Sequence, residues 1–250
     1  MAKLSGKTAV VTGASKGIGA AIAEVLGRNG AQVVVNYAHD KAGAERVVKV
    51  IQSAGSKAIA VQADVSRKDD IEKLFRETKK AFGQVDVLVN NAGVYEFRPL
   101  ETVDEDHFHR HFNLNVLGLL LTTQEAVKAM NGAGGSIINI SSLVSRQPVQ
   151  ASSVYSATKG AVDVITQVLA QELGQKKIRV NALSPGVTDT EGVRSGPGEN
   201  KAFLDYAVSR TPLGRLGAAE DIADAALFLA SDDSRWITGE AVQIGGGLRV

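Results

Sequence analysis

Cysteine is absent from the chain, and its absence removes three kinds of chemistry at once. Without cysteine the protein has no disulfide, no thiolate zinc site and no cysteine nucleophile. A chain without thiols fits a reducing compartment, so we expect a cytoplasmic protein.

Neither sign of charge dominates, and long apolar runs are lacking. The 28 basic and 27 acidic residues leave a net charge of +1, whereas nucleic-acid and membrane-surface partners require a field of one sign. The apolar stretch 116–121 is interrupted by Gly118 and is too short to span a bilayer. The polar residues 1–7 do not resemble a signal peptide. We therefore predict no nucleic-acid partner and no membrane partner.

Histidine is scarce, and its pattern does not indicate a metal site. His107, His109 and His111 alternate by two along a predicted helix, which scatters them around the helix, whereas a metal site prefers positions i and i+4. We therefore expect solvated or packed histidines and no metal.

Seven short apolar runs, rich in β-branched residues, are spread along the 250 residues with helical patterns between them. Such runs are typical of parallel strands that are covered on both faces. They predict an α/β fold: one Rossmann-like domain over residues 1–250, with a seven-stranded parallel sheet and helices on both faces. The runs are 8–11, 33–35, 58–61, 85–89, 137–140, 178–183 and 241–244.

Helices are predicted between these runs. Residues 20–26 form one that ends near Gly30, Ser66 caps one that reaches about Phe82, and residues 154–173 form a long one. The glycine-rich segment 190–200, after the sixth strand, predicts a flexible substrate lid at about 187–209, with a surface loop as the alternative.

A glycine-rich loop follows the first predicted strand directly and leads into a helix. It reads Thr12-Gly13-Ala14-Ser15-Lys16-Gly17-Ile18-Gly19. Gly13 allows the tight turn, Gly17 lets the backbone approach a pyrophosphate, and Gly19 lets helix and strand pack closely. Because the helix N-terminus presents free N–H groups to phosphates, we predict a dinucleotide site that also includes Ser15, Lys16 and Ile18.

The spacing of these glycines resembles that of the short-chain dehydrogenase/reductase family, whose T-G-x-x-x-G-x-G matches residues 12–19 at every fixed position. The motifs Asn90-Asn91-Ala92-Gly93 and Ser184-Pro185-Gly186 extend the resemblance, which covers residues 8 to about 247. It implies a cofactor floor at Asn91, Ala92 and Gly93, an adenine contact at Asp64 and Val65, and nicotinamide contacts at Pro185, Gly186, Thr188 and Thr190. Taken alone, Asp64 is more typical of a turn.

The second strand ends in Asn36-Tyr37-Ala38, without the carboxylate that binds the ribose 2′-hydroxyl in NAD-preferring proteins. Lys16 offers a positive charge for a 2′-phosphate, although it could also be a solvated surface lysine. We therefore predict NADP(H) as the cofactor, with Asn36 and Tyr37 among its contacts.

Tyr155 and Lys159 are four positions apart in the predicted helix 154–173, so both lie on one face. Carbonyl reduction needs a proton donor, and a nearby ammonium lowers the pKa of a phenol. We predict Tyr155 as the proton donor and Lys159 as its helper, both also in contact with the cofactor. Many surface helices contain the same pair.

Ser142 follows the fifth strand, and its separation from Tyr155 matches the family's serine-to-tyrosine gap. A hydroxyl there can bind the substrate oxygen, with Ser141 as the adjacent competitor. The resemblance also implies that Asn115 orders a proton relay; Asn113 is its competitor.

The expected reaction is reversible hydride transfer between NADP(H) and a ketone or secondary alcohol. The substrate pocket is predicted from residues 94–97, 143–147 and the lid through Phe203. The chain is similar to 3-oxoacyl-acyl-carrier-protein reductases, glucose and other sugar dehydrogenases, and ketoreductases. Because residues 151–154 depart from the acyl reductases' usual sequence, we favour a small-molecule carbonyl or alcohol substrate.

Two further expectations concern class and assembly. A non-catalytic NADP(H)-binding sensor or scaffold is the alternative from another class, and the four residues Asn115, Ser142, Tyr155 and Lys159 argue against it. The resemblance implies a homotetramer in which the helices of Asn115 and Tyr155 pack against a neighbour. An apolar stripe at Val162, Ile165, Val168 and Leu169 is compatible with that assembly, and residues 248–250 are expected at a second interface.

Overall fold

The computed structural model describes residues 2–194 and 201–248. Seven strands form one parallel sheet in the order β3-β2-β1-β4-β5-β6-β9. Their bounds are β1 Thr8–Val11, β2 Gln32–Tyr37, β3 Ala58–Gln62, β4 Val87–Asn90, β5 Gly135–Ile140, β6 Ile178–Pro185 and β9 Ala241–Ile244. Each of the seven predicted runs overlaps one of these strands, so the predicted sheet is confirmed.

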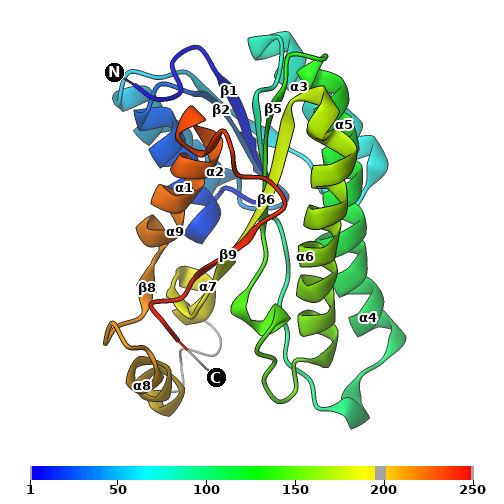
Figure 1. The fold of residues 1–250 in the computed structure, drawn as a ribbon, viewed down its shortest axis with the longest axis vertical. Helices are drawn as coiled ribbons and strands as arrows, with labels where there is room; N and C mark the ends of the chain where they lie inside the picture. Colours follow the sequence, from blue (N-terminus) through cyan, green and yellow to red (C-terminus); the bar gives the residue numbers. More distant parts are fainter. Residues whose placement is uncertain (1, 195–200, 249–250) are drawn as a thin grey trace.

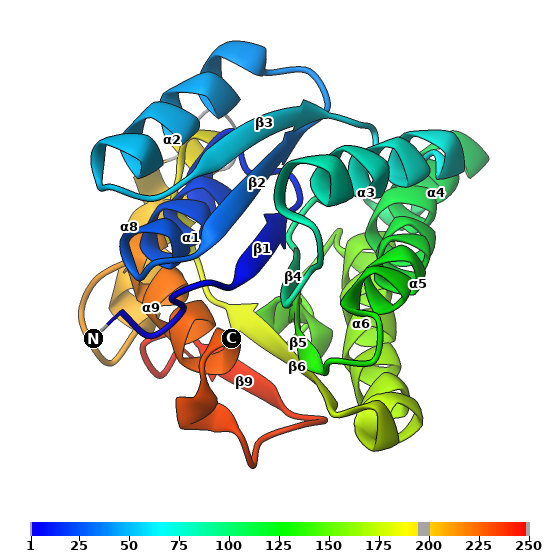
Figure 2. The ribbon, with the colours of Figure 1, turned by 90° about the horizontal axis from the view of Figure 1, so that it is seen from above.

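Helices cover both faces of this sheet (Figures 1 and 2). Helices α1, α2 and α9 lie on one face, and α3, α4, α5 and α6 lie on the other. Their bounds are α1 Gly17–Arg28, α2 Lys41–Ser53, α3 Lys68–Phe82, α4 Glu105–Phe112, α5 Leu119–Met130, α6 Ser153–Leu173 and α9 Ala219–Ala230. None of the helices in the described part of the chain has the length and apolar character needed to cross a bilayer.

The strands divide their side chains between two cores because successive residues of a strand point to opposite faces. In β2, Val33 and Val35 pack with α1, α2 and α9, whereas Val34 packs with the helices of the other face. All three valines are fully buried. A strand that buries both faces carries no polar alternation, which is why continuous apolar runs predicted the sheet.

One local prediction fails. Ser66 does not cap α3: its hydroxyl donates to Asp64 Oδ1 at 2.8 Å, and Arg67 stands at the N-cap without a side-chain bond. Asn115 lies in a π-helical turn, Asn113–Gly118, between α4 and α5. This turn brings Gly118 against Val65, where a Cβ would meet the Val65 carbonyl oxygen at 2.5 Å.

The predicted lid consists of small elements at the carboxyl ends of the strands. They are β7 Thr188–Asp189, α7 Glu191–Arg194 and α8 Lys201–Arg210, and β7 pairs with β8, Gly217–Ala218. Residues 195–200 of the lid, and 249–250 of the predicted interface tail, lie outside the described residues.

A chain of buried amides and hydroxyls connects the central strands to α5 and α6. Asn90 Nδ2 donates to Thr123 Oγ1 and to Asn139 Oδ1, each at 2.9 Å. Asn139 Nδ2 in turn donates to Thr166 Oγ1 at 2.9 Å. Each of these residues is at most 5 % exposed, so the bonds have no competition from water.

Asn139→Ala is expected to lower the free energy of unfolding by about 3 kcal/mol, because buried groups left unpaired cost about 1–3 kcal/mol each. Thr122→Val is the matched control, since Thr122 Oγ1 is buried without a hydrogen-bond partner among the described residues. Urea unfolding of both variants measures the difference. A loss for Asn139→Ala no larger than that for Thr122→Val would contradict the structural role of this network.

Candidate active site

The glycine loop between β1 and α1 has the shape that the sequence predicted. Gly13 and Gly17 have φ values of +60° and +57°, a region that side chains disfavour. A Cβ on Gly19 would lie 2.6 Å from the Gly13 carbonyl oxygen, so only glycine lets α1 start this close to the strand. Lys16 stands at the N-cap of α1 with an exposed side chain and without a side-chain capping bond.

Thr12 and Asn91 join the glycine loop to the loop after β4. Thr12 Oγ1 accepts hydrogen bonds from the backbone N–H groups of Asn91 and Ala92, both at 3.0 Å. Asn91 Nδ2 donates back to the carbonyl oxygens of Thr12 and Gly13, at 2.9 and 3.0 Å. Asn91 and Ala92 therefore form the floor beneath Gly13, whose Cβ position would be 2.9 Å from Ala92 Cα.

The side chain of Asn36 bonds to the backbone of neighbouring segments, and a cofactor contact at this residue stays a prediction. It is 1 % exposed, and its Oδ1 accepts from the Gly13 N–H at 3.2 Å. Its Nδ2 donates to the carbonyl oxygens of Val61 and Ala63, at 3.3 and 2.9 Å. The amide thus supports the glycine loop from below, and Tyr37 beside it is also buried.

The acidic residues near this loop act in turns and caps. Asp64 Oδ1 accepts from the Ser66 N–H at 2.9 Å, which is the turn role that the sequence left open, and Val65 is buried. Asp40, which the sequence analysis missed, accepts from the Gly43 N–H at 2.8 Å and caps α2. A Cβ on Gly43 would be 2.5 Å from the Ser15 carbonyl oxygen, so the start of α2 lies against the glycine loop.

Ser142, Tyr155 and Lys159 come together where β5 ends and α6 begins. Lys159 Nζ donates to the Ile140 carbonyl oxygen at 2.8 Å and lies 5.7 Å from the centre of the Tyr155 ring. The Ser142 side chain lies near enough to the Tyr155 hydroxyl to oppose the rise in its pKa. Ser141 points elsewhere, because its buried hydroxyl donates to the Lys159 carbonyl oxygen at 3.3 Å. The geometry therefore favours Ser142 over its neighbour.

Burial controls the protonation of this group, and one expectation about it is wrong. The sequence led us to expect a lowered pKa for Tyr155, but burial raises the pKa of Tyr155 to about 12, with the nearby Ser142 side chain opposing the shift. Burial also lowers the pKa of Lys159 to about 8, against the attraction of Asp163. The buried phenol is therefore neutral, while the Lys159 ammonium donates to the Ile140 carbonyl oxygen.

Asn115 connects the loop after β4 to α6. Its Oδ1 accepts from the Val94 N–H, and its Nδ2 donates to the Val94 carbonyl oxygen, both at 2.9 Å. Nδ2 also reaches Thr158 Oγ1 at 3.1 Å, and Thr158 donates to the Tyr155 carbonyl oxygen at 2.7 Å. Asn113 is exposed, so the buried Asn115 is the residue that faces the site.

Gly93 leaves room beside this group. A Cβ on Gly93 would lie 3.1 Å from Asn115 Oδ1 and 3.8 Å from Lys159 Nζ. A larger residue would therefore fill the space next to the lysine.

The segment after β6 lies next to the glycine loop and to the segment after β9. Gly186 packs against Gly245, where a Cβ would meet the Gly245 Cα at 3.0 Å, and Pro185 precedes it at the end of β6. Thr188 is buried and donates to the Gly186 carbonyl oxygen at 3.1 Å. Thr190 lies over the glycine loop, 3.5 Å from where a Cβ of Gly17 would be.

The histidines are not scattered as expected. His107 and His111 are i and i+4, which places both on the buried face of α4 with ring centres 4.4 Å apart. Within residues 2–194 and 201–248, no three histidine or acidic side chains gather as a metal site would require.

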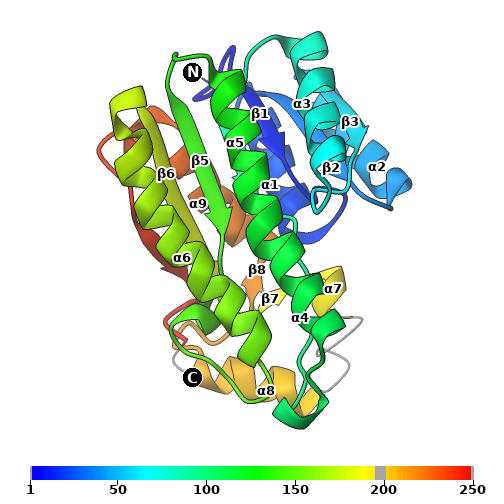
Figure 3. The ribbon, with the colours of Figure 1, turned by 90° about the vertical axis from the view of Figure 1, so that its right-hand side faces the viewer.

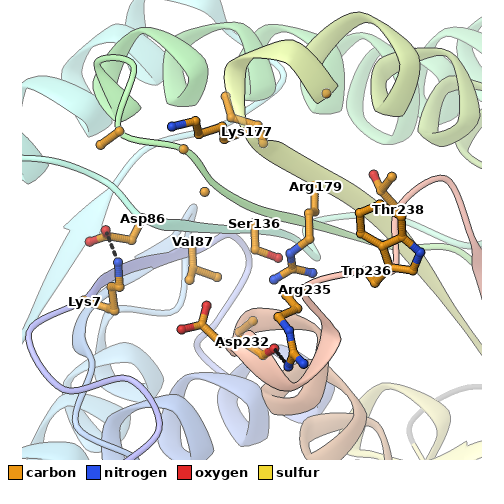
Figure 4. A pocket seen from close by; sticks show the side chains of 16 residues that line it. Lys7, Asp86, Val87, Ser136, Lys177, Arg179, Asp232, Arg235, Trp236 and Thr238 are labelled. Carbon is orange, nitrogen blue, oxygen red and sulfur yellow. Dashed lines mark hydrogen bonds and ion pairs between the residues drawn. The ribbon is translucent and has the colours of Figure 1, made fainter.

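A pocket of about 530 Å³ lies at the other end of the strands, beside their amino ends (Figure 4). Lys7 on its wall donates to Asp86 at 3.1 Å. Arg179 donates to Ser234 Oγ at 2.9 Å and to the Leu229 carbonyl oxygen at 2.8 Å. Lys7 and Arg179 in this pocket thus bond to other groups of the protein. None of the predicted site residues lines the pocket. In parallel α/β sheets ligands bind at the carboxyl ends of strands, so this pocket is not the candidate active site.

The glycine loop, the floor and the Tyr155 group lie at the carboxyl ends of β1, β4 and β5, where a dinucleotide would lie along the switch in strand order. Because Gly13, Gly17 and Gly93 carry no side chains, such a molecule could approach the backbone closely at these positions. The arrangement can hold a diphosphate at α1 and place a proton donor, Tyr155, beside a reacting oxygen.

Thr12, Thr158 and Asp163 hold the predicted residues in place, and the sequence alone assigned none of them a role. Asp163 is buried four positions after Lys159 and accepts from the Ser145 hydroxyl at 2.7 Å. Its i+4 spacing was a usable signal. Thr12 is a fixed position of the glycine motif, whereas Thr158 was marked only by its place between Tyr155 and Lys159.

Comparison with known proteins identifies relatives that match nearly the whole chain. The family profile described as enoyl-(acyl carrier protein) reductase matches residues 13–249. An uncharacterized oxidoreductase of Methylorubrum extorquens is 55% identical over 100% of both chains. A versicolorin reductase of Emericella nidulans is 41% identical over 98% of this chain and 96% of its own.

Two solved structures share the fold along the whole chain. The angucycline C-6 ketoreductase LanV with bound NADP superposes with a TM-score of 0.92 at 36% identity, covering 98% of this chain and 96% of its own. A short-chain dehydrogenase from Burkholderia cenocepacia in complex with NADP gives a TM-score of 0.91 at 35% identity, with 98% of each chain covered. The chain therefore belongs to the short-chain dehydrogenase/reductase family of oxidoreductases.

Proposed function

We propose that the protein is an NADP(H)-dependent carbonyl reductase and alcohol dehydrogenase that acts on a small-molecule ketone or secondary alcohol. The observation that carries the proposal is the gathering of three side chains where β5 ends and α6 begins: the buried Tyr155 side chain, the Ser142 hydroxyl near it, and the buried Lys159, whose Nζ lies 5.7 Å from the centre of the Tyr155 ring. Ketoreductase relatives, one of them with bound NADP, support the same activity.

In the direction of reduction, Ser142 and Tyr155 hold the substrate oxygen, and Tyr155 donates the proton. When bound, the nicotinamide supplies the hydride. With a pKa of about 12, the phenol carries its proton throughout the neutral range and is a competent acid. Lys159 lies close enough to stabilise the phenolate that remains. Asn115, linked through Thr158 to the Tyr155 backbone, holds the helix start in position.

The alternatives differ in substrate. A 3-oxoacyl-acyl-carrier-protein reductase would need a basic rim for an acidic carrier. The candidate rim residues are Lys128, which is paired with Glu125 at 2.6 Å, and the exposed Lys176 and Lys177. Glucose or another sugar as substrate stays open, and a sugar and ketone panel separates the two. A sensor or scaffold would bind NADPH without turning over any member of that panel.

Exposed apolar side chains support the predicted homotetramer. Helices α4 and α5 follow one another end to end and run beside α6 (Figure 3). Leu117, Val164 and Val168 of these helices and the turn 113–118 are 45%, 60% and 44% exposed. Val162 of the predicted stripe is instead fully buried in the core. Apolar exposure of this kind is typical of an interface. The tetramer, the lid at 187–209 and the cytoplasmic location stay predictions.

Tyr155→Phe is expected to lower kcat for ketone reduction by about 10²–10⁴-fold, because the proton donor is lost while the ring remains. The dissociation constant of NADPH, measured by fluorescence titration, is expected to stay within about twofold of that of the wild type. A variant that keeps most of its rate would show that Tyr155 is not the donor. A wild-type protein that binds NADPH but reduces no ketone or sugar would contradict the enzyme proposal.

The kcat/KM for reduction is expected to fall as pH rises through about 8, because Lys159 then loses its proton and no longer stabilises the phenolate. Asp163 raises the pKa of Lys159, so Asp163→Asn is expected to move this decline toward lower pH. Glu172→Gln, exposed on the same helix, is the control. An unmoved or upward-shifted profile in Asp163→Asn would rule out this electrostatic role.

The protein is expected to prefer NADPH over NADH in kcat/KM. Lys16→Ala is expected to lower the value for NADPH about tenfold or more and to leave that for NADH nearly unchanged, because bonds to charged groups contribute about 1.5–3 kcal/mol. Steady-state assays with both cofactors measure this. A wild-type preference for NADH, or an equal loss with both cofactors, would overturn the assignment of the 2′-phosphate to Lys16.

A further inference from the structure

A carboxylate from a distant part of the chain lies at the N-terminus of α1. The Gly17 N–H donates to Glu191 Oε2 at 3.1 Å, across 174 positions of sequence. Gly17 is the first residue of α1, whose N-cap makes no side-chain bond and whose first turn contains no acidic residue. Glu191 therefore supplies the negative charge that complements this positive end of the helix dipole.

The same N–H group belongs to the loop that would bind the diphosphate of a dinucleotide. A Cβ at Gly17 would lie 3.5 Å from Thr190 Cβ and 3.8 Å from Glu191 Oε2, so Thr190 and Glu191 cover this glycine directly. A diphosphate is also an anion and needs the same donor. Carboxylate and diphosphate therefore compete for one N–H and repel each other at short range.

The backbone that carries Glu191 is held as one unit. Arg194 donates two hydrogen bonds to the Asp189 carboxylate, at 2.7 and 2.8 Å, and its N–H donates to the Thr190 carbonyl oxygen at 2.9 Å. Gly192 in this unit lies against Tyr95, whose Oη would be 2.9 Å from a Cβ there. A displacement of Glu191 is thus coupled to a contact on the substrate side of the site.

We propose that Glu191 is a built-in competitor of the cofactor diphosphate, which weakens cofactor binding and speeds cofactor release. The inference rests on the proposed function, since it takes a nicotinamide dinucleotide as the ligand of the glycine loop. Cofactor release limits turnover in many enzymes, so a residue that takes over the vacated donor shortens that step. The carboxylate reclaims the Gly17 N–H as the diphosphate leaves, and residues 188–194 follow it.

The test measures NADPH binding to Glu191→Gln, which keeps the size of the side chain and removes its charge. Fluorescence titration is expected to give a dissociation constant about tenfold lower than that of the wild type, with most of the change in the dissociation rate seen by stopped flow. Glu72→Gln removes the same charge from α3, where Glu72 is paired with Lys68 at 3.8 Å, and is expected to change neither value.

Adenosine 2′-monophosphate separates the diphosphate from the rest of the cofactor. It lacks the diphosphate bridge, so its dissociation constant is expected to be equal in wild type and Glu191→Gln. An unchanged or higher dissociation constant for NADPH in Glu191→Gln overturns the proposal, and so does an equal gain with both ligands. If the wild type binds neither NADPH nor NADH, the proposed function itself fails. That outcome differs from equal NADPH dissociation constants in the wild type and Glu191→Gln, which would contradict only the role of Glu191.

Discussion

The hydrogen bonds between Thr12 and Asn91 join the loops that follow β1 and β4, and the rest of the site depends on them. The strand order reverses at β1, so the loops after β1 and β4 leave the sheet beside each other and form a crevice. These bonds fix the position of the glycine loop relative to the floor formed by residues 91–93. Asn36 completes this support from below by accepting from the Gly13 N–H.

The catalytic group is built on burial, and burial has opposite effects on its two titratable members. It raises the pKa of Tyr155 and so keeps the phenol protonated as an acid. It lowers the pKa of Lys159 and so brings the ammonium close to losing its proton. The Ile140 carbonyl oxygen at the end of β5 accepts a hydrogen bond from the Lys159 ammonium, and Asp163 on α6 raises the pKa of Lys159. Both groups therefore favour the protonated lysine.

The sheet and much of the site were predictable because they depend on local pattern. Strands buried on both faces are recognisable as β-branched runs, and many backbone positions with positive φ are recognisable as glycines. The i+4 spacing of Tyr155 and Lys159 places both on one face of α6, as predicted. Contacts between distant segments were not predictable. The bonds of Asn36 to Val61 and Ala63 follow from the register of β2 on β3. The bond from Gly17 to Glu191, and the burial that sets the pKa of Tyr155, exist only after folding.

Hydride transfer to a carbonyl carbon is the central claim, and isotope transfer tests it most directly. The purified protein is incubated with a ketone and NADPH carrying deuterium at the transferable position of the nicotinamide, and the product is analysed by mass spectrometry. We expect an alcohol with one deuterium on the carbinol carbon for each cofactor molecule oxidised. Cofactor oxidation without deuterated alcohol, or an alcohol that has taken its carbon-bound hydrogen from water, would contradict the central claim.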